Sequence, residues 1–204
     1  MFRIQTKNAI APKGLEVLRQ AGCAVGPETE APHALLIRSA PLHDLGKIEI
    51  PDAVLNKPGK LTDEEYSHMK YHTLAGKKII ERSAQAVAEP GYLLEAGRLA
   101  EYHHERWDGK GYPHGEMGEV IPLSARIMAV ADVFDALVSK RSYKEGFSIE
   151  KSLDIIREGI GTQFDPQVAK AFLDAEPEIR KIAEENNAEE NDAEENNAEE
   201  KAEN

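Results

Sequence analysis

The chain of 204 residues contains one cysteine, no long apolar run and fewer basic than acidic residues. Cys23 has no partner within the chain for a disulfide. No segment approaches the roughly 20 apolar residues that a membrane-spanning helix needs. The opening residues also lack the pattern of a secretory signal peptide. We therefore expect a cytoplasmic protein that has no membrane partner.

Positive charge is scarce, because 25 lysines and arginines stand against 37 aspartates and glutamates, for a formal net charge of −12. Residues 183–204 hold ten acidic residues and one lysine, which accounts for −9 and leaves −3 for the rest of the chain. This balance argues against a nucleic-acid polymer as partner, because polyanions bind to basic surfaces. A small ligand that carries phosphate is compatible with the local charges of Lys140, Arg141 and Lys144.

The acidic end of the chain is repetitive. The unit Ala-Glu-Glu-Asn-Asn recurs almost without change between residues 183 and 200. It contains no branched or aromatic side chain, so a helix there would have no apolar face to bury. Residues 177–204 are therefore predicted to form a disordered acidic tail rather than a binding element.

Residues 1–38 differ in pattern from the rest of the chain. An alternating segment at Phe2–Thr6, a helical segment at Pro12–Gly22 and an apolar run at Ala34–Ile37 indicate a short β-α-β unit. From Pro41 onward helical signals dominate, including a capping box of Thr62 and Glu65. They predict helices over about 62–73, 95–105, 122–140, 148–159 and from 165 onward. The expected fold is mainly α, a helical bundle with a glycine-rich loop between residues 108 and 118.

The adjacent histidines His103 and His104 are the most informative feature of the sequence. Two imidazoles held side by side are costly unless an electron-poor group lies between them, so the pair indicates a metal site. Further candidate ligands lie at His43-Asp44, His72 and Asp132.

His72 and His68 are alternatives, because they lie one turn apart on a predicted helix and resemble a helical two-histidine site. His68 shares its turn with acidic residues of a solvated face, so we interpret His72 as the ligand and His68 as a surface residue. A core or surface histidine without a ligand role is the other interpretation of His72.

Asp132 stands within the apolar run 127–134. A buried ionised carboxylate is costly unless a cation or hydrogen-bond donors meet it, and a metal would meet that need. The alternative is a helix residue on a polar stripe shared with Asp135.

Mixed imidazole and carboxylate ligands suit Mn, Fe, Zn or Ni, and the lack of nearby cysteines excludes a thiolate site. The candidates outnumber the ligands of one closed zinc site, which favours two metals bridged by Asp44. Such pairs hydrolyse phosphodiesters, which we take as the reaction class.

Eight motifs occur in order along the chain, at His43–Pro51, Lys57–Thr62, Met69–His72, His103–Pro113, Ile121–Arg126, Ala131–Leu137, Arg141–Lys144 and Phe164–Pro166. Together they resemble the HD-GYP family, a branch of the HD phosphohydrolases, across about residues 39–174. The resemblance implies an HD-type helical bundle over residues 39–176. It also implies metal-dependent hydrolysis of the bacterial second messenger cyclic di-GMP to pGpG or GMP, in signal transduction.

The resemblance implies roles for individual residues by their motif positions. The implied metal ligands are His43, Asp44, His72, His103, His104 and Asp132. The implied cofactors are two or three divalent metals, most often Fe or Mn. Catalysis is assigned to Asp44 and to Lys47 near the bridging water, and the substrate phosphate to Arg141 and Lys144. The signature loop of Gly111, Tyr112 and Pro113 is implied in the shape of the substrate site and in contacts with GGDEF-domain proteins.

Residues 1–40 instead resemble the start of a D-3-phosphoglycerate dehydrogenase, on the stretches Ile10–Leu18 and Ala34–Ala40. This match includes no dinucleotide-binding or catalytic part, so it implies no dehydrogenase activity. HD-GYP domains have leading helices at this position, which supply a further metal-ligating histidine. His33 follows a proline at a strand entrance, and we do not expect it to substitute.

We interpret the junction near residues 38–41 as a gene fusion or truncation, with two consequences. The first is weakened or absent activity. The second is exposed apolar surface that favours a homodimer or lowers stability.

Two other functions remain open. A catalytically inactive adaptor or cyclic di-GMP receptor would retain the substrate pocket or the loop around Tyr112 without a complete metal centre. An HD enzyme for another nucleotide is the second, although the intact loop argues against it.

Overall fold

The structure is a computed structural model that describes residues 3–7, 24–26, 34–37, 42–88, 90–139 and 146–181. Several predictions lie outside these residues: the helix at 12–22, the phosphate contacts of Arg141 and Lys144, the exclusion of His33, and the acidic tail from residue 182.

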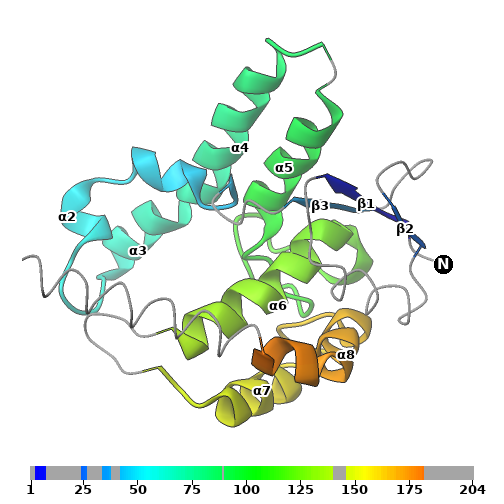
Figure 1. Cartoon of the computed structure of the whole chain (residues 1–204). Helices are drawn as coiled ribbons and strands as arrows, with labels where there is room; N and C mark the ends of the chain where they lie inside the picture. The colour runs from blue at the N-terminus through cyan, green and yellow to red at the C-terminus, as the bar shows by residue number, and fades with distance from the viewer. Residues whose placement is uncertain are drawn as a thin grey trace, which may run out of the picture.

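Three short parallel strands lie near the N-terminus: β1 (Arg3–Lys7), β2 (Ala24–Gly26) and β3 (Ala34–Ile37), in the order β2-β1-β3. The sequence predicts β1 and β3 but not β2, because three residues are too few to show an alternating pattern. In Figure 1 the sheet lies beside the inner end of helix α5 (Gly91–Tyr102). β3 contacts both α5 and α6 (Leu123–Val138), so the sheet adjoins the helical bundle.

The other regular elements of the described chain are helices, as predicted, and loops connect them. Besides α5 and α6, they are the 3-10 helices η2 (Leu45–Glu49) and η3 (Gly118–Val120) and the helices α2 (Asp52–Leu55), α3 (Asp63–Lys70), α4 (His72–Ala84), α7 (Ile149–Glu158) and α8 (Pro166–Asp174). The predicted capping box is present, because Thr62 Oγ1 accepts from the Glu65 backbone and Glu65 accepts from the Thr62 backbone. Ser148 and Asp165 cap α7 and α8, as their sequence positions predict.

Two predicted helices are wrong in their extent: the helix predicted over 95–105 is α5, which begins at Gly91 and ends at Tyr102, and the other is the helix predicted over 62–73. The structure divides the latter at Tyr71 into α3 and the longer α4, whose second half the sequence analysis did not predict. The junction is stabilised by side chains, because His72 Nδ1 lies 2.7 Å from the Met69 carbonyl oxygen and the Thr73 hydroxyl donates to the Lys70 carbonyl. These bonds give the carbonyls at the end of α3 side-chain partners. The break also turns the His72 side chain toward the interior, where it is 1% exposed.

Among the described residues, apolar clusters of the core lie on either side of α6. Val130 and Phe134 of α6 pack against Leu153 and Ile156 of α7 and against Phe164 before α8. On the other side, α4 and α5 pack along each other as a hairpin around a small apolar cluster, which contains Ile80, Ala96 and Ala100. Figure 1 shows α6 crossing the centre of the molecule between the α4–α5 hairpin and the α7–α8 pair. The inner ends of α4 and α5 therefore face α6.

In the part of the chain that the structure describes, no helix combines the length and the apolar character needed to cross a membrane.

Candidate metal centre

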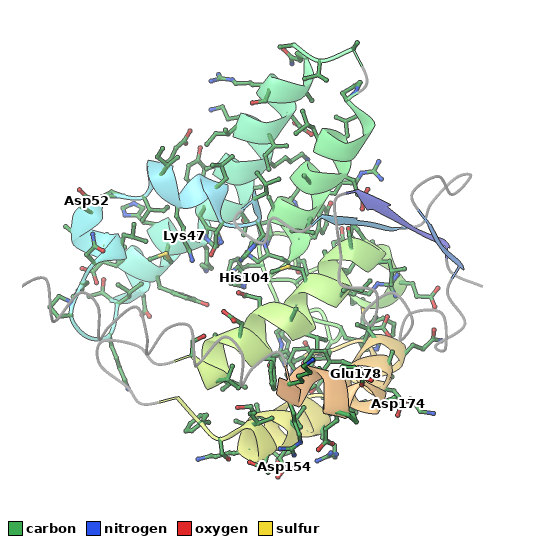
Figure 2. All side chains as sticks on the ribbon, in the orientation of Figure 1. Lys47, Asp52, His104, Asp154, Asp174 and Glu178 are labelled. Atoms are coloured by element: carbon green, nitrogen blue, oxygen red, sulfur yellow. The ribbon has the colours of Figure 1, made fainter. Side chains whose placement is uncertain are left out.

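Six imidazole and carboxylate side chains meet where the inner ends of α4 and α5 approach α6. We call them the His/Asp cluster: His43, Asp44, His72, His103, His104 and Asp132. The first two precede η2, His72 begins α4, the histidine pair follows α5, and Asp132 lies in α6. Figure 2 shows Lys47 and His104 near this central region, whereas Asp154, Asp174 and Glu178 lie by α7 and α8, away from it. All the residues that the sequence predicts as ligands are thus brought together.

His72 and His103 present their Nε2 atoms to each other at 3.4 Å. The other ring nitrogen of each contacts a carbonyl three residues earlier, at 2.7 Å for Met69 and 2.9 Å for Ala100. A carbonyl oxygen only accepts, so each Nδ1 carries a proton and each neutral ring has a lone pair on Nε2. Two lone pairs cannot form a hydrogen bond, so this arrangement suits a cation between the rings. Carbonyl-anchored imidazoles of this kind are usual among metal ligands.

Burial keeps these imidazoles neutral. Desolvation, together with the neighbouring histidines, lowers the pKa of His103 to about 3. Desolvation also lowers the pKa of His104 to about 4 and lowers that of His72. A neutral imidazole is the form that binds a metal, so the three rings are ready to coordinate at neutral pH without first losing a proton.

Two cations, the His43 imidazolium and the Lys47 ammonium, lie beside the carboxylates of the cluster. His43 Nε2 lies 3.3 Å from Asp44 Oδ2 and 3.6 Å from Asp132 Oδ1. Burial lowers the pKa of His43, but the two carboxylates outweigh it and raise that pKa to about 9. Burial likewise opposes ionisation of Asp44 and Asp132, yet the His43 imidazolium lowers the pKa of both carboxyls. Lys47 Nζ adds a second cation 2.5 Å from Asp44 Oδ2.

A close crossing of two backbones sets the distance between Asp44 and His72. A Cβ on Gly46 of η2 would lie 1.9 Å from the His72 carbonyl oxygen and 2.4 Å from the Gly76 nitrogen of α4. Glycine is therefore required for η2 to lie against α4. As a result Asp44 Oδ1 reaches within 3.5 Å of His72 Nε2 and 4.0 Å of His103 Nε2.

The glycine-rich loop folds back over the histidine pair. A Cβ on Gly111 would overlap the backbone of residues 104–106, and the Tyr112 N–H donates to the His104 carbonyl at 3.2 Å. The Tyr112 ring consequently stacks on the His104 ring, with centroids 4.7 Å apart and planes 29° from parallel. Burial raises the pKa of the Tyr112 hydroxyl. The loop thus covers one side of the cluster with a neutral aromatic ring.

Two groups within the cluster have ligand atoms close enough to share a metal ion: His72, His103 and His104, and His43, Asp44 and His103. In each group all the ligand atoms lie within 4.8 Å of one another. Imidazole nitrogens and carboxylate oxygens together are the donor set of divalent transition metals. The residues present therefore fit such a metal on their own chemistry.

A sequence profile of the HD domain family matches residues 15–168, three quarters of the chain. The chain belongs to the HD domain family. The predicted resemblance to the HD-GYP branch is confirmed by its relatives. The match starts upstream of residue 39, where the sequence analysis predicts the domain to begin, and that boundary stays a prediction.

Several curated relatives align with this HD domain. A cyclic di-GMP phosphodiesterase of Vibrio cholerae is 52% identical over 73% of this chain and 30% of its own length. The cyclic di-GMP phosphodiesterase response regulator RpfG of Xanthomonas campestris is 47% identical over 71% of this chain and 37% of its length. A 3'3'-cGAMP-specific phosphodiesterase 2 of Vibrio cholerae is 41% identical over 69% of this chain and 26% of its own length. The chain thus spans about a third of the length of the relatives it matches.

Three polar residues around the HD domain's cluster were not singled out from the sequence. Glu101 and Glu105 bracket the histidine pair, and both are nearly buried, at 4% and 3% exposed. Both contact His114, which no sequence argument assigned. The available signal was the pair of carboxylates flanking adjacent histidines. His68, in contrast, is exposed on α3, consistent with its interpretation as a surface residue.

Proposed function

We propose that this HD domain hydrolyses cyclic di-GMP to pGpG or GMP at a centre of divalent metals, as a step of second-messenger signalling. The convergence of the His/Asp cluster on one buried point carries the proposal. The names of the relatives support the choice of substrate.

The His/Asp cluster would hold two or three ions, with Fe or Mn as the proposed metals and Asp44 as the proposed bridge. When bound, such ions activate a water molecule as nucleophile and neutralise the charge that develops on the phosphate. The lone pairs of His72 and His103 and the carboxylates of Asp44 and Asp132 are the donors that would accept them.

Basic residues would neutralise the negative charge of the substrate. Lys47 lies at the rim of the cluster, with its side chain 41% exposed, and its ammonium holds Asp44. We assign to Lys47 the orientation of the attacking water beside Asp44. Arg141 and Lys144 are proposed to hold a phosphate of the dianionic substrate, because two cations suit it.

The test is hydrolysis by protein purified without oxygen and loaded with Mn²⁺ or Fe(II). The variants Asp44→Ala and His103→Ala should lose turnover, whereas His68→Ala, which removes an exposed histidine of α3, should keep it. Metal-loaded wild-type protein that leaves the dinucleotide intact would refute the catalytic proposal.

A second candidate is a receptor or adaptor that binds cyclic di-GMP without cleaving it. It is favoured by the described residues upstream of Leu42, which form strands, whereas the HD-GYP resemblance implies helices that carry a further ligand. Elemental analysis separates the two candidates. Fewer than two bound metal equivalents, together with calorimetric binding and no turnover, would select the receptor.

Other properties of the proposed enzyme are testable in the same way. The similarity to a 3'3'-cGAMP-specific relative calls for a direct comparison of both dinucleotides as substrates. We propose contacts with GGDEF-domain proteins through the loop around Tyr112 and a homodimer in solution. Co-purification tests the contact with GGDEF-domain proteins, and light scattering tests the homodimer.

A further inference from the structure

His104 is oriented differently from the other two buried histidines of the His/Asp cluster. The rings of His72 and His103 are anchored by carbonyls, whereas no hydrogen bond among the described residues involves the His104 imidazole. The His104 ring instead contacts the His103 ring at 4.1 Å between centroids, meets the His72 ring edge-on at 5.1 Å, and stacks on the Tyr112 ring at 4.7 Å. Because carbonyls fix the His72 and His103 rings, Tyr112 is the one of these three neighbours whose position can change the direction in which His104 points.

Tyr112 in turn depends on the backbone of its loop. Its N–H donates to the His104 carbonyl, and Gly111 packs directly against the backbone of residues 104–106. Backbone hydrogen bonds also hold the two ends of the loop, because the Asp108 N–H donates to the Thr162 carbonyl and the Gly118 N–H donates to the Trp107 carbonyl. The middle of the loop, just beyond Tyr112, has a further anchor.

That anchor is His114, just beyond the signature residues. Glu105 Oε1 accepts from the backbone N–H of His114 at 2.7 Å and of Gly115 at 3.1 Å. Glu101 Oε1 lies 2.9 Å from the His114 Nε2, and Glu101 Oε2 lies 2.8 Å from Lys77 Nζ of α4. Both carboxylates belong to the segment that carries the histidine pair. We call Glu101, Glu105 and His114 the His114 clamp.

We propose that the His114 clamp positions Tyr112 and, through its ring, the metal ligand His104, so that Glu105 is a positioning residue of the centre. Buried carboxylate acceptors form strong hydrogen bonds to backbone N–H groups, which suits the task. The second oxygen of Glu105 is buried and accepts no hydrogen bond from any described residue. Oε1 is therefore the Glu105 atom that holds the loop, and the amide of a glutamine could replace the carboxylate. The inference rests on the proposed function only in that a metal occupies the cluster.

Hydrogen exchange measured by mass spectrometry tests the clamp directly. Glu105→Ala should increase exchange in the peptide that spans residues 108–118 and leave α7 unchanged. Glu105→Gln should restore protection, because it keeps the acceptor. Glu119→Ala, the same deletion at an exposed position near the end of this loop, should match wild type. Unaltered exchange of the loop in Glu105→Ala, or equal loosening by all three variants, would overturn the proposal.

Calorimetric titration with Mn²⁺ tests the link to His104. Loss of an outer-sphere positioning group lowers metal affinity by about 10- to 100-fold. We expect this loss in Glu105→Ala with the number of sites unchanged, and wild-type affinity in Glu105→Gln. An opened loop with wild-type Mn²⁺ affinity would overturn the role in positioning His104.

A second variant and a comparison with wild type cover the remaining outcomes. Should Glu105→Ala fail to fold, His114→Ala removes the imidazole at the more exposed side of the clamp, and the same exchange and titration apply. Wild-type protein that binds no Mn²⁺ would refute the proposed function, whereas equal binding by wild type and Glu105→Ala would refute this inference alone.

Discussion

Replacing Gly46 with alanine tests whether the crossing of η2 and α4 builds the metal centre. The new Cβ would lie 1.9 Å from the His72 carbonyl oxygen, and Cβ contacts essentially never fall below 3.0 Å. The two backbones must therefore separate by about 1 Å. No side-chain rotation can relieve the contact, because the atoms that the Cβ meets belong to the backbone of His72 and Gly76.

The expected cost follows from this displacement. Overpacking costs about 1–3 kcal/mol, and we expect about 3 kcal/mol here because backbone must move. The same movement lengthens the 3.5 Å separation between Asp44 Oδ1 and His72 Nε2. Metal–ligand distances tolerate only about 0.2 Å, so affinity for Mn²⁺ should fall by at least about tenfold.

Urea denaturation and calorimetric titration with Mn²⁺ measure the two effects. Gly97→Ala is the matched control, because a Cβ at Gly97 of α5 would meet only atoms of α4, at 3.7 Å or more. Alanine there should raise stability by about 0.5–1 kcal/mol through its helix propensity. If Gly46→Ala is as stable as wild type and binds Mn²⁺ equally well, the backbone crossing does not determine the site.

Three further outcomes are expected. Arg126→Ala should lower the free energy of unfolding by about 3–5 kcal/mol. The reason is that Arg126 forms a nearly buried ion pair with Asp165, the cap of α8. A loss of stability below about 1 kcal/mol would contradict this prediction. Metal binding should release about one proton per chain near neutral pH, since the raised pKa of His43, about 9, keeps it protonated until a metal displaces the proton. Calorimetry in buffers of different ionisation enthalpy measures this release, and identical apparent enthalpies would argue against it. Mn²⁺ at about 100 times its dissociation constant should add about 2.7 kcal/mol of stability, and EDTA should reverse the gain in thermal melts.

The helical elements follow from local sequence signals, and these were read correctly where the signal is short-range. Thr62 with Glu65, Ser148 and Asp165 each cap a helix through bonds that span two or three residues, so the pattern is complete in the sequence. The division between α3 and α4 was missed. It depends on whether the side chains of His72 and Thr73 turn back to carbonyls, which helix periodicity does not report.

The membership of the His/Asp cluster was also predictable. Adjacent histidines, a His-Asp pair and an acidic residue within an apolar helix each conflict with a plain core, so the residue types pointed to a common ligand. The pKa shifts of these residues in the assembled cluster were not predictable. The opposite pKa shifts of His43 and His103 arise from burial and from the neighbours of each ring: two carboxylates outweigh burial and raise the pKa of His43, whereas burial, together with other imidazoles, lowers the pKa of His103.

The sequence by itself determined the helical composition of the bundle, the identity of the six clustered side chains and the HD family, because these depend on residue type and spacing along the chain. Only the tertiary structure decided how closely η2 lies against α4, which lone pairs face each other, and that Glu101 and Glu105 both hold His114. Those features depend on contacts between backbones and side chains far apart in sequence, and no local pattern encodes such distances.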